Sequence, residues 1–119
     1  MLIACVSFYC LRANLTLAQV FTSSYDCTVR KLSFTSGIST EVFSMEDTLI
    51  TGIDLPVAGN EMWISDAAGG ITHLDLREDK SKARWYQVSD QKVGSVSINP
   101  IAPHYLVTAS NSRTMRCVL

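Results

Sequence analysis

Short runs of apolar residues follow one another along the chain and are separated by Gly, Pro, Asp, Asn and Ser. Many of the runs alternate apolar with polar residues and are rich in β-branched and aromatic side chains, which is typical of β-strands. No ten-residue stretch shows the i, i+3, i+4, i+7 spacing of an amphipathic helix. The pattern therefore predicts an all-β fold. The predicted strands cover residues 19–23, 28–34, 40–45, 49–55, 62–65, 71–76, 84–88, 93–98, 105–109 and 114–118.

A seven-residue phrase occurs three times at nearly constant spacing. It reads SYDCTVR at 24–30, DAAGGIT at 66–72 and SNSRTMR at 110–116, so that corresponding residues lie 42 and 44 positions apart. A repeat of about 40–45 residues that consists of short strands is typical of β-propeller blades. A blade buries its two faces only against neighbouring blades, so the repeat predicts that this chain is part of a larger assembly of blades.

The strands group into units of one blade each. We expect an atypical N-terminal segment at 1–18, a partial blade at 19–45, a complete blade at 49–88 and a truncated blade at 93–119. Propellers usually close with four to eight blades of four strands. The expected fold is thus a β-propeller fragment of about two and a half blades, which is not enough to close, and the chain is interpreted as a fragment of a longer protein.

Composition fits a folded domain, and the charges are unevenly placed. The chain is 47% hydrophobic and 18% charged, so it can form a core. Its net charge of −1 predicts no general attraction to polyanions. Residues 1–76 carry three basic and eight acidic groups, whereas residues 77–92 carry five basic and three acidic groups. The basic run is interpreted as a solvated loop.

The cysteines and histidines show no pattern of a metal site. They follow no zinc-ligand spacing, and we expect thiols in a reducing compartment and no metal or other cofactor. These residues are Cys5, Cys10, Cys27, Cys117, His73 and His104.

The sequence also predicts no enzymatic activity. A Gly-x-Ser-x-Gly elbow is absent, and Ala68-Gly69-Gly70 lacks the lysine and the following helix of a phosphate-binding loop. His73 and Asp75 share a strand face, but Lys31 and Ser33 stand at the matching positions of the first repeat. The pair is therefore interpreted as part of a half-exposed strand face.

The N-terminus leaves an alternative open. Residues 2–11 are uncharged and mostly apolar, and residues 16–18 resemble a signal-peptide cleavage site beside a glycosylation sequon at Asn14. This reading predicts a small secreted protein. No basic residue precedes the apolar run, and the run is too short to span a bilayer, so an apolar strand or an irregular start is favoured.

The repeated phrase resembles the WD-repeat family, in which a serine, a turn aspartate and a threonine precede a strand that ends in Trp-Asp. Asp26 stands at the turn aspartate, which is expected to hydrogen-bond neighbouring backbone and hold the hairpin. Ala68 and Ser112 replace it in the other copies, so those turns must be held in another way. Leucine stands in place of the tryptophan at Leu32 and Leu74.

Longer stretches carry a more specific resemblance, from about residue 13 to residue 116. SSYDCTVRKLSF, AAGGITHLDLREDKSKARWYQVSDQKVGSVSINP and HYLVTASNSRTMR are similar to nuclear WD-repeat proteins of the DNA-damage response. They are more distantly similar to the WD-repeat subunit of the damaged-DNA-binding complex. The resemblance implies a non-enzymatic, nuclear scaffold that binds DNA and chromatin proteins and acts as a substrate receptor of a cullin-4 ubiquitin ligase. It implies no membrane and no small-molecule substrate.

Two candidate sites follow from this resemblance by position. Asp75 and Arg77 have the Asp-x-Arg form of the motif by which such receptors dock on the ligase adaptor. Lys92 lies in the loop where the damaged-DNA-binding relative carries a lysine-rich run, and it is the candidate DNA contact. Trp85 and Tyr86 precede this loop, and strand alternation predicts that at least one packs in the core. A truncated product without a function of its own is a further alternative.

Overall fold

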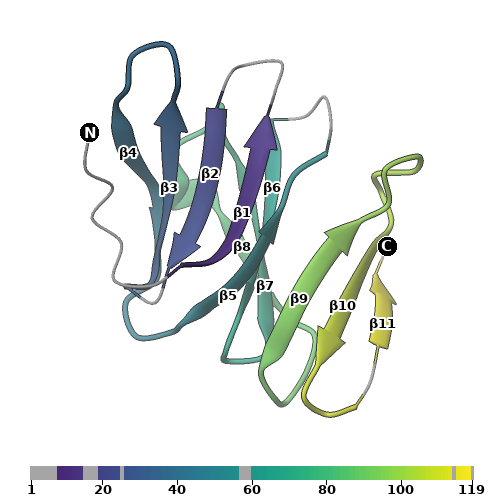
Figure 1. Ribbon diagram of the computed structural model, residues 1–119. Helices are drawn as coiled ribbons and strands as arrows, with labels where there is room; N and C mark the ends of the chain where they lie inside the picture. Colours follow the sequence, from purple (N-terminus) through teal and green to yellow (C-terminus); the bar gives the residue numbers. More distant parts are fainter. Residues whose placement is uncertain (1–7, 15–18, 25, 57–59, 114, 119) are drawn as a thin grey trace.

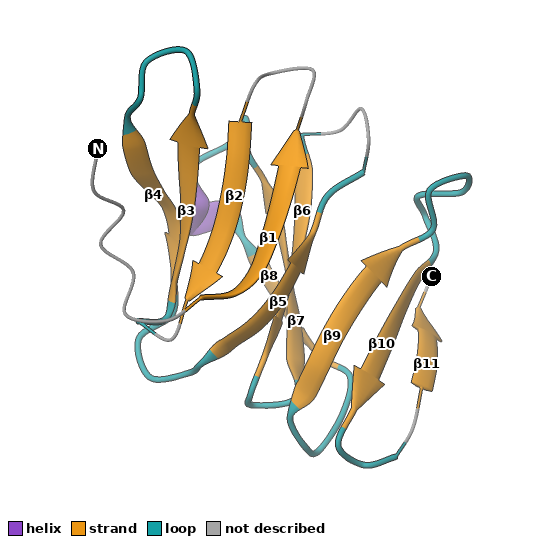
Figure 2. Cartoon of the chain, viewed as in Figure 1, coloured by secondary structure: helices purple, strands orange, loops and turns teal. Residues whose placement is uncertain are grey.

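A computed structural model describes residues 8–14, 19–24, 26–56, 60–113 and 115–118 (Figure 1). These parts of the chain are almost entirely strand and turn, apart from the 3-10 turn η1 (Lys80–Lys82) (Figure 2). The ten strands predicted from the sequence agree with observed strands to within one residue at each end. The strands are β1 (Phe8–Asn14), β2 (Gln19–Ser24), β3 (Thr28–Ser33), β4 (Ser39–Ser44), β5 (Ile50–Asp54), β6 (Glu61–Asp66), β7 (Gly70–Asp75), β8 (Arg84–Gln87), β9 (Val93–Ile98), β10 (Leu106–Ser110) and β11 (Met115–Val118).

The strands form three antiparallel sheets in chain order. The sheets are β1-β2-β3-β4, β5-β6-β7-β8 and β9-β10-β11. The first strands of the three sheets, β1, β5 and β9, lie side by side (Figure 1), and β4, β8 and β11 are the opposite edge strands of their sheets. This is the arrangement of consecutive propeller blades, and the all-β fold class is confirmed.

The first sheet has one strand more than the sequence analysis expected. Phe8–Asn14 pairs with β2 from Asn14 opposite Gln19 to Phe8 opposite Ser24. This segment contains aromatic and apolar β-formers, and its pairing supplies hydrogen-bond partners along the inner edge of β2. The first sheet therefore has four strands rather than three. The candidate cleavage motif at 16–18 and residues 1–7 lie outside the described residues.

Strands β5, β6 and β7 of the middle sheet are buried on both faces because their residues alternate between two cores, whereas β8 is exposed. Met62, Ile64 and Leu74 point toward the first sheet, whereas Ile71 and the partly buried Trp63 point toward the third. Each fully buried aliphatic side chain contributes about 1.5–3 kcal/mol relative to an exposed one. The first core comprises Phe21, Val29, Ile50, Ile53, Met62, Ile64 and Leu74, and the second comprises Ile71, Val96 and Leu106.

The three copies of the repeated phrase form turns with the same backbone geometry. The fourth residue of each copy lies in the left-handed region, with φ of 66° at Cys27, 91° at Gly69 and 63° at Arg113. Equivalent positions in the repeat thus share one unusual conformation. This agreement shows that the three phrases are structural equivalents and not a chance similarity of sequence.

The first residue of the phrase holds each turn. In the second copy, Asp66 Oδ1 accepts hydrogen bonds from the backbone N–H groups of Ala68 (2.8 Å) and Gly70 (3.0 Å). In the first copy, Ser24 Oγ accepts from the N–H of Asp26 (3.2 Å). In the third, the hydroxyls of Ser110 and Ser112 are 2.5 Å apart. The phrase opens with a short polar side chain in each copy, and this explains how the turns that lack an aspartate at the third position are held.

Asp26 adds a second set of contacts to the first turn. Its Oδ1 accepts hydrogen bonds from the backbone N–H of Thr28 (3.0 Å) and from the Thr28 hydroxyl (2.6 Å). Partial burial favours the protonated acid, but the hydrogen bonds from Thr28 and Ser24 outweigh it and lower the pKa of Asp26.

Side-chain hydrogen bonds at both ends of β5 join the second sheet to the third. Near the start of β5, the buried Thr51 hydroxyl donates to the carbonyl of Val93. At its end, Asp54 Oδ2 accepts from the backbone N–H of Ile98 at 2.7 Å. These bonds satisfy backbone groups of β9 that face the neighbouring sheet, so they set the position of β9 along β5.

Gly69 and Gly37, which both have left-handed backbone, provide a matched test of how closely the β6–β7 turn packs against the β8–β9 loop. A Cβ at Gly69 would lie 2.2 Å from the carbonyl oxygen of Ser89, whereas a Cβ at Gly37 (φ 69°) would meet nothing within 4 Å. Gly37→Ala should lower the free energy of unfolding by about 1–2 kcal/mol, from backbone strain alone. Gly69→Ala should lower it by clearly more, because it adds a steric clash. Urea unfolding measures both, and equal effects would contradict the packing described here.

Candidate functional site

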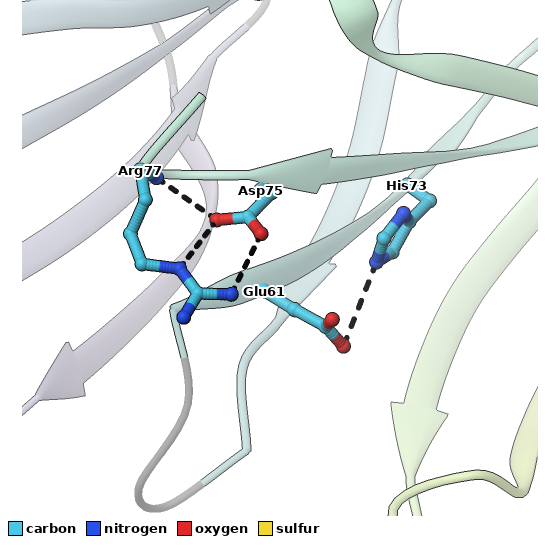
Figure 3. A network of polar contacts seen from close by, with 4 residues as sticks. All are labelled: Glu61, His73, Asp75 and Arg77. Carbon is cyan, nitrogen blue, oxygen red and sulfur yellow. Dashed lines mark hydrogen bonds and ion pairs between the residues drawn. The ribbon is translucent and has the colours of Figure 1, made fainter. Parts of the chain in front are cut away.

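Asp75 and Arg77 form a two-pronged ion pair at the end of β7. Arg77 donates from Nε to Asp75 Oδ1 (3.1 Å) and from Nη2 to Asp75 Oδ2 (2.8 Å), and its backbone N–H also donates to Oδ1 (2.9 Å) (Figure 3). Asp75, the last residue of β7, thus orients both the backbone and the guanidinium of Arg77 in the loop that follows. Bidentate pairs of this kind restrict the arginine to one plane.

The pair presents Arg77 to solvent. The Arg77 side chain is 65% exposed and that of Asp75 is 17% exposed. The guanidinium has five N–H groups, and only two of them are used by Asp75, so three remain for another acceptor. The hydrogen bonds from Arg77 lower the pKa of Asp75 to about 2, and the carboxylate in turn raises the pKa of Arg77. Both groups are therefore charged at any physiological pH.

His73 belongs to the same strand face but has different partners. Its Nε2 lies 3.6 Å from Glu61 Oε2 (Figure 3), and its ring centroid lies 4.7 Å from that of Trp63. In the part of the chain that the structure describes, the contacts of His73 are thus a carboxylate and an indole. His73 and Asp75 are both partly exposed, in agreement with their interpretation as part of a half-exposed strand face.

Lys92 lies at the opposite end of β8 from Arg77, at the junction of the second and third sheets. The backbone N–H groups of Val88 and Ser89 both donate to the carbonyl of Gly69 (3.0 Å each), which fixes the start of this loop against the β6–β7 turn. The carbonyl of Lys92 accepts from the N–H of Asn111 (2.9 Å) in the β10–β11 turn. The structure therefore places Lys92 between two turns of the repeated phrase and does not bring it near Arg77.

Trp85 and Tyr86 are both half exposed, which corrects the expectation that at least one is a core residue. Trp85 is 46% exposed and Tyr86 is 45% exposed. Neighbouring residues of a strand point to opposite faces, and β8 is the outer edge strand of its sheet, so neither ring is enclosed in a core. Tyr86 lies 6.2 Å from Trp63 between ring centroids.

The indole of Trp85 is held by a buried carboxylate that the sequence analysis did not single out. Trp85 Nε1 donates to Oδ2 of Asp66 at 2.8 Å, and Asp66 is fully buried. A Cβ at Gly70 would come 2.0 Å from Trp85 Nε1, so only glycine leaves room for the ring. The sequence feature that could have identified Asp66 is its place as the first residue of the phrase, where the other copies have Ser24 and Ser110.

Within the described ranges, no group of three His, Cys, Asp or Glu side chains is placed to hold a metal ion. No helix found there is long and apolar enough to cross a membrane.

Comparison with known proteins shows homology to fungal proteins over most of the chain. It is 42% identical over 105 residues to DNA damage-binding protein CMR1 of Cryptococcus neoformans, a match that covers 82% of this chain and 18% of that protein. The protein of the same name from Mycosarcoma maydis is 33% identical over 134 residues, covering 96% of this chain and 20% of that protein. The chain thus spans about a fifth of the length of these relatives. No family model matches the chain.

A solved structure shows the same fold. The crystal structure of Chaetomium thermophilum Raptor matches with a TM-score of 0.80 at 18% sequence identity, covering 91% of this chain and 10% of that one. At this level of identity the match confirms the all-β propeller fold and carries no information on function.

The Asp75–Arg77 pair predicts an unusual titration. The pKa of Asp75 is about 2 when folded against an ordinary value of 3.8, so the pair is intact above pH 3.8 and is lost as the pH falls through about 2. Carbonyl-carbon NMR should therefore show the Asp75 carboxyl titrating near pH 2. Arg77→Gln should move this midpoint up toward 3.8, whereas Arg84→Gln on β8 should not. A midpoint near 3.8 in the unmodified chain would contradict the ion pair.

Proposed function

We propose that this chain forms part of the β-propeller of a non-enzymatic nuclear scaffold that binds DNA and chromatin in the DNA-damage response. The observation that carries this proposal is the 42% identity over most of the chain to a protein named for binding damaged DNA. The resemblance of its sequence to WD repeat-containing protein 76 supports the same assignment. As part of such a protein, the chain would also help to serve as a substrate receptor of a cullin-4 ubiquitin ligase.

The docking part of the proposal assigns Arg77 to the contact with the ligase adaptor. Arg77 is 65% exposed, and Asp75 holds its guanidinium while three N–H groups stay available. A guanidinium fixed in this way loses little conformational entropy when it binds a carboxylate or a carbonyl. These features support docking through the β7–β8 end of the second sheet.

The DNA part of the proposal assigns Lys92 to a phosphate contact. Its backbone is fixed by the bond from Asn111, and it lies at the β8–β9 end of the sheets, away from Arg77. A lysine at a phosphate adds sequence-independent affinity that falls as the salt concentration rises.

Charge reversal at Lys92 should weaken DNA binding. With a fluorescein-labelled 25-base-pair duplex at low salt, Lys92→Glu should weaken binding on the order of tenfold and reduce the slope of log Kd against log salt by about 0.9 or more. Lys82→Glu is the matched control, because Lys82 is an exposed lysine at the other end of β8. Equal effects of the two variants would indicate general electrostatics and would remove Lys92 from the site.

Loss of the bidentate geometry at Arg77 should weaken adaptor capture. Arg77→Lys keeps the positive charge but cannot make two parallel N–H···O bonds, so it should reduce binding to the purified cullin-4 adaptor nearly as much as Arg77→Ala. Arg84→Ala, at an exposed arginine on β8, should bind like the unmodified chain. Full binding by Arg77→Lys would show that only charge matters there, and full binding by Arg77→Ala would exclude docking through this residue.

A further inference from the structure

The tip of the β10–β11 turn has an arginine at a position where the backbone favours glycine. Arg113 has φ of 63° and is exposed, and it is equivalent to Gly69 in the second turn and Cys27 in the first. Left-handed backbone is disfavoured for side chains other than glycine, asparagine and aspartate. The turn thus holds a charged side chain at a position where it makes the backbone less stable, as Cys27 also does without a charge.

The charge at this tip changes from sheet to sheet. The third and fourth residues of the phrase are Asp26-Cys27, Ala68-Gly69 and Ser112-Arg113, so one backbone geometry carries a negative, a neutral and a positive tip in turn. From residue 91 onward the chain has Lys92, Arg113 and Arg116 and no acidic residue. The chain from residue 91 onward is therefore purely basic, whereas residues 1–76 are predominantly acidic.

Arg113 also lies beside the loop that carries Lys92. Asn111, two residues before Arg113, donates its backbone N–H to the carbonyl of Lys92 at 2.9 Å. The β8–β9 loop and the β10–β11 turn are thus joined by their backbones at the same end of the sheets. Asp90, the acidic residue of the β8–β9 loop, precedes Lys92, whereas Arg113 lies in the turn that contacts the Lys92 backbone.

We propose that Arg113 is a second phosphate contact, and that Lys92 and Arg113 together bind the backbone of duplex DNA across the junction of the second and third sheets. This inference rests on the proposed DNA binding. It adds Arg113 to the contact and extends the DNA path from Lys92 to the β10–β11 turn. Two cations on neighbouring rigid turns suit successive phosphates of one strand, which repeat along a regular path and need no recognition of bases.

Arg113→Gly separates binding from stability. Glycine relieves the left-handed strain, so this variant should have a higher midpoint in urea than the unmodified chain. It should also bind the labelled 25-base-pair duplex several-fold more weakly at low salt, with a slope of log Kd against log salt reduced by about 0.9. A gain in stability with a loss of affinity would not arise from damage to the fold.

Two further variants keep the test specific. Cys27→Gly makes the same backbone change at the equivalent position of the first turn and should raise the urea midpoint without changing DNA affinity. Ser112→Asp gives the third turn the aspartate of the first, so it should preserve folding while it weakens binding through its negative charge.

The outcomes distinguish a failure of the Arg113 contact from a failure of the proposed DNA binding on which it rests. If the unmodified chain binds the duplex and Lys92→Glu weakens binding while Arg113→Gly leaves affinity and salt slope unchanged, the role of Arg113 is overturned and that of Lys92 stands. If Cys27→Gly weakens binding as much as Arg113→Gly, turn rigidity rather than charge is responsible, and the inference is also overturned. If the unmodified chain binds no duplex at low salt, both proposals fail for this chain.

Discussion

Burial of both faces of the β5–β8 sheet is the constraint on which the rest of this structure depends. A sheet with apolar residues at alternating positions on both faces needs a neighbour on each side, and here the β1–β4 and β9–β11 sheets supply them through two separate cores. The inner strands are then brought side by side, and the hydrogen bonds from Thr51 and Asp54 fix how β9 lies along β5. The relative positions of the loops at the two ends of the sheets follow from this packing.

Conserved turn geometry within the repeat allows the tips to differ in chemistry. The polar side chain that opens each phrase makes a hydrogen bond within the turn, and the fourth residue is left-handed in all three copies although it is cysteine, glycine or arginine. In the second turn the tip is constrained, because Gly69 packs against the carbonyl of Ser89. In the third turn an arginine is accommodated. A repeated scaffold can therefore present different charges at equivalent places while its backbone geometry stays the same.

The sequence was most informative where local patterns decide the structure. Alternation and turn residues located ten strands, and the recurring phrase identified the blade repeat, because both signals are short-range. β1 was missed as part of the first sheet, since its place depends on the free edge of β2 rather than on a motif of its own. The exposure of Trp85 and Tyr86 was also misjudged, because alternation specifies opposite faces but not whether an outer edge strand is covered on either. The hydrogen bond between Trp85 and Asp66 joins residues from different strands, so no local sequence pattern predicts it.

The two proposed contacts are separated by the length of β8. Arg77 lies at the β7–β8 end of the sheets, and Lys92 and Arg113 lie at the opposite end, so one partner can occupy each end without competing for the same surface. The intervening strand belongs to a sheet that is packed between two others, and such a sheet resists bending. In the proposed scaffold, such a sheet would hold the adaptor contact and the DNA contact at a fixed separation. The stacked sheets provide that fixed separation, and the chemistry of each end is supplied by loop residues whose positions the packing determines.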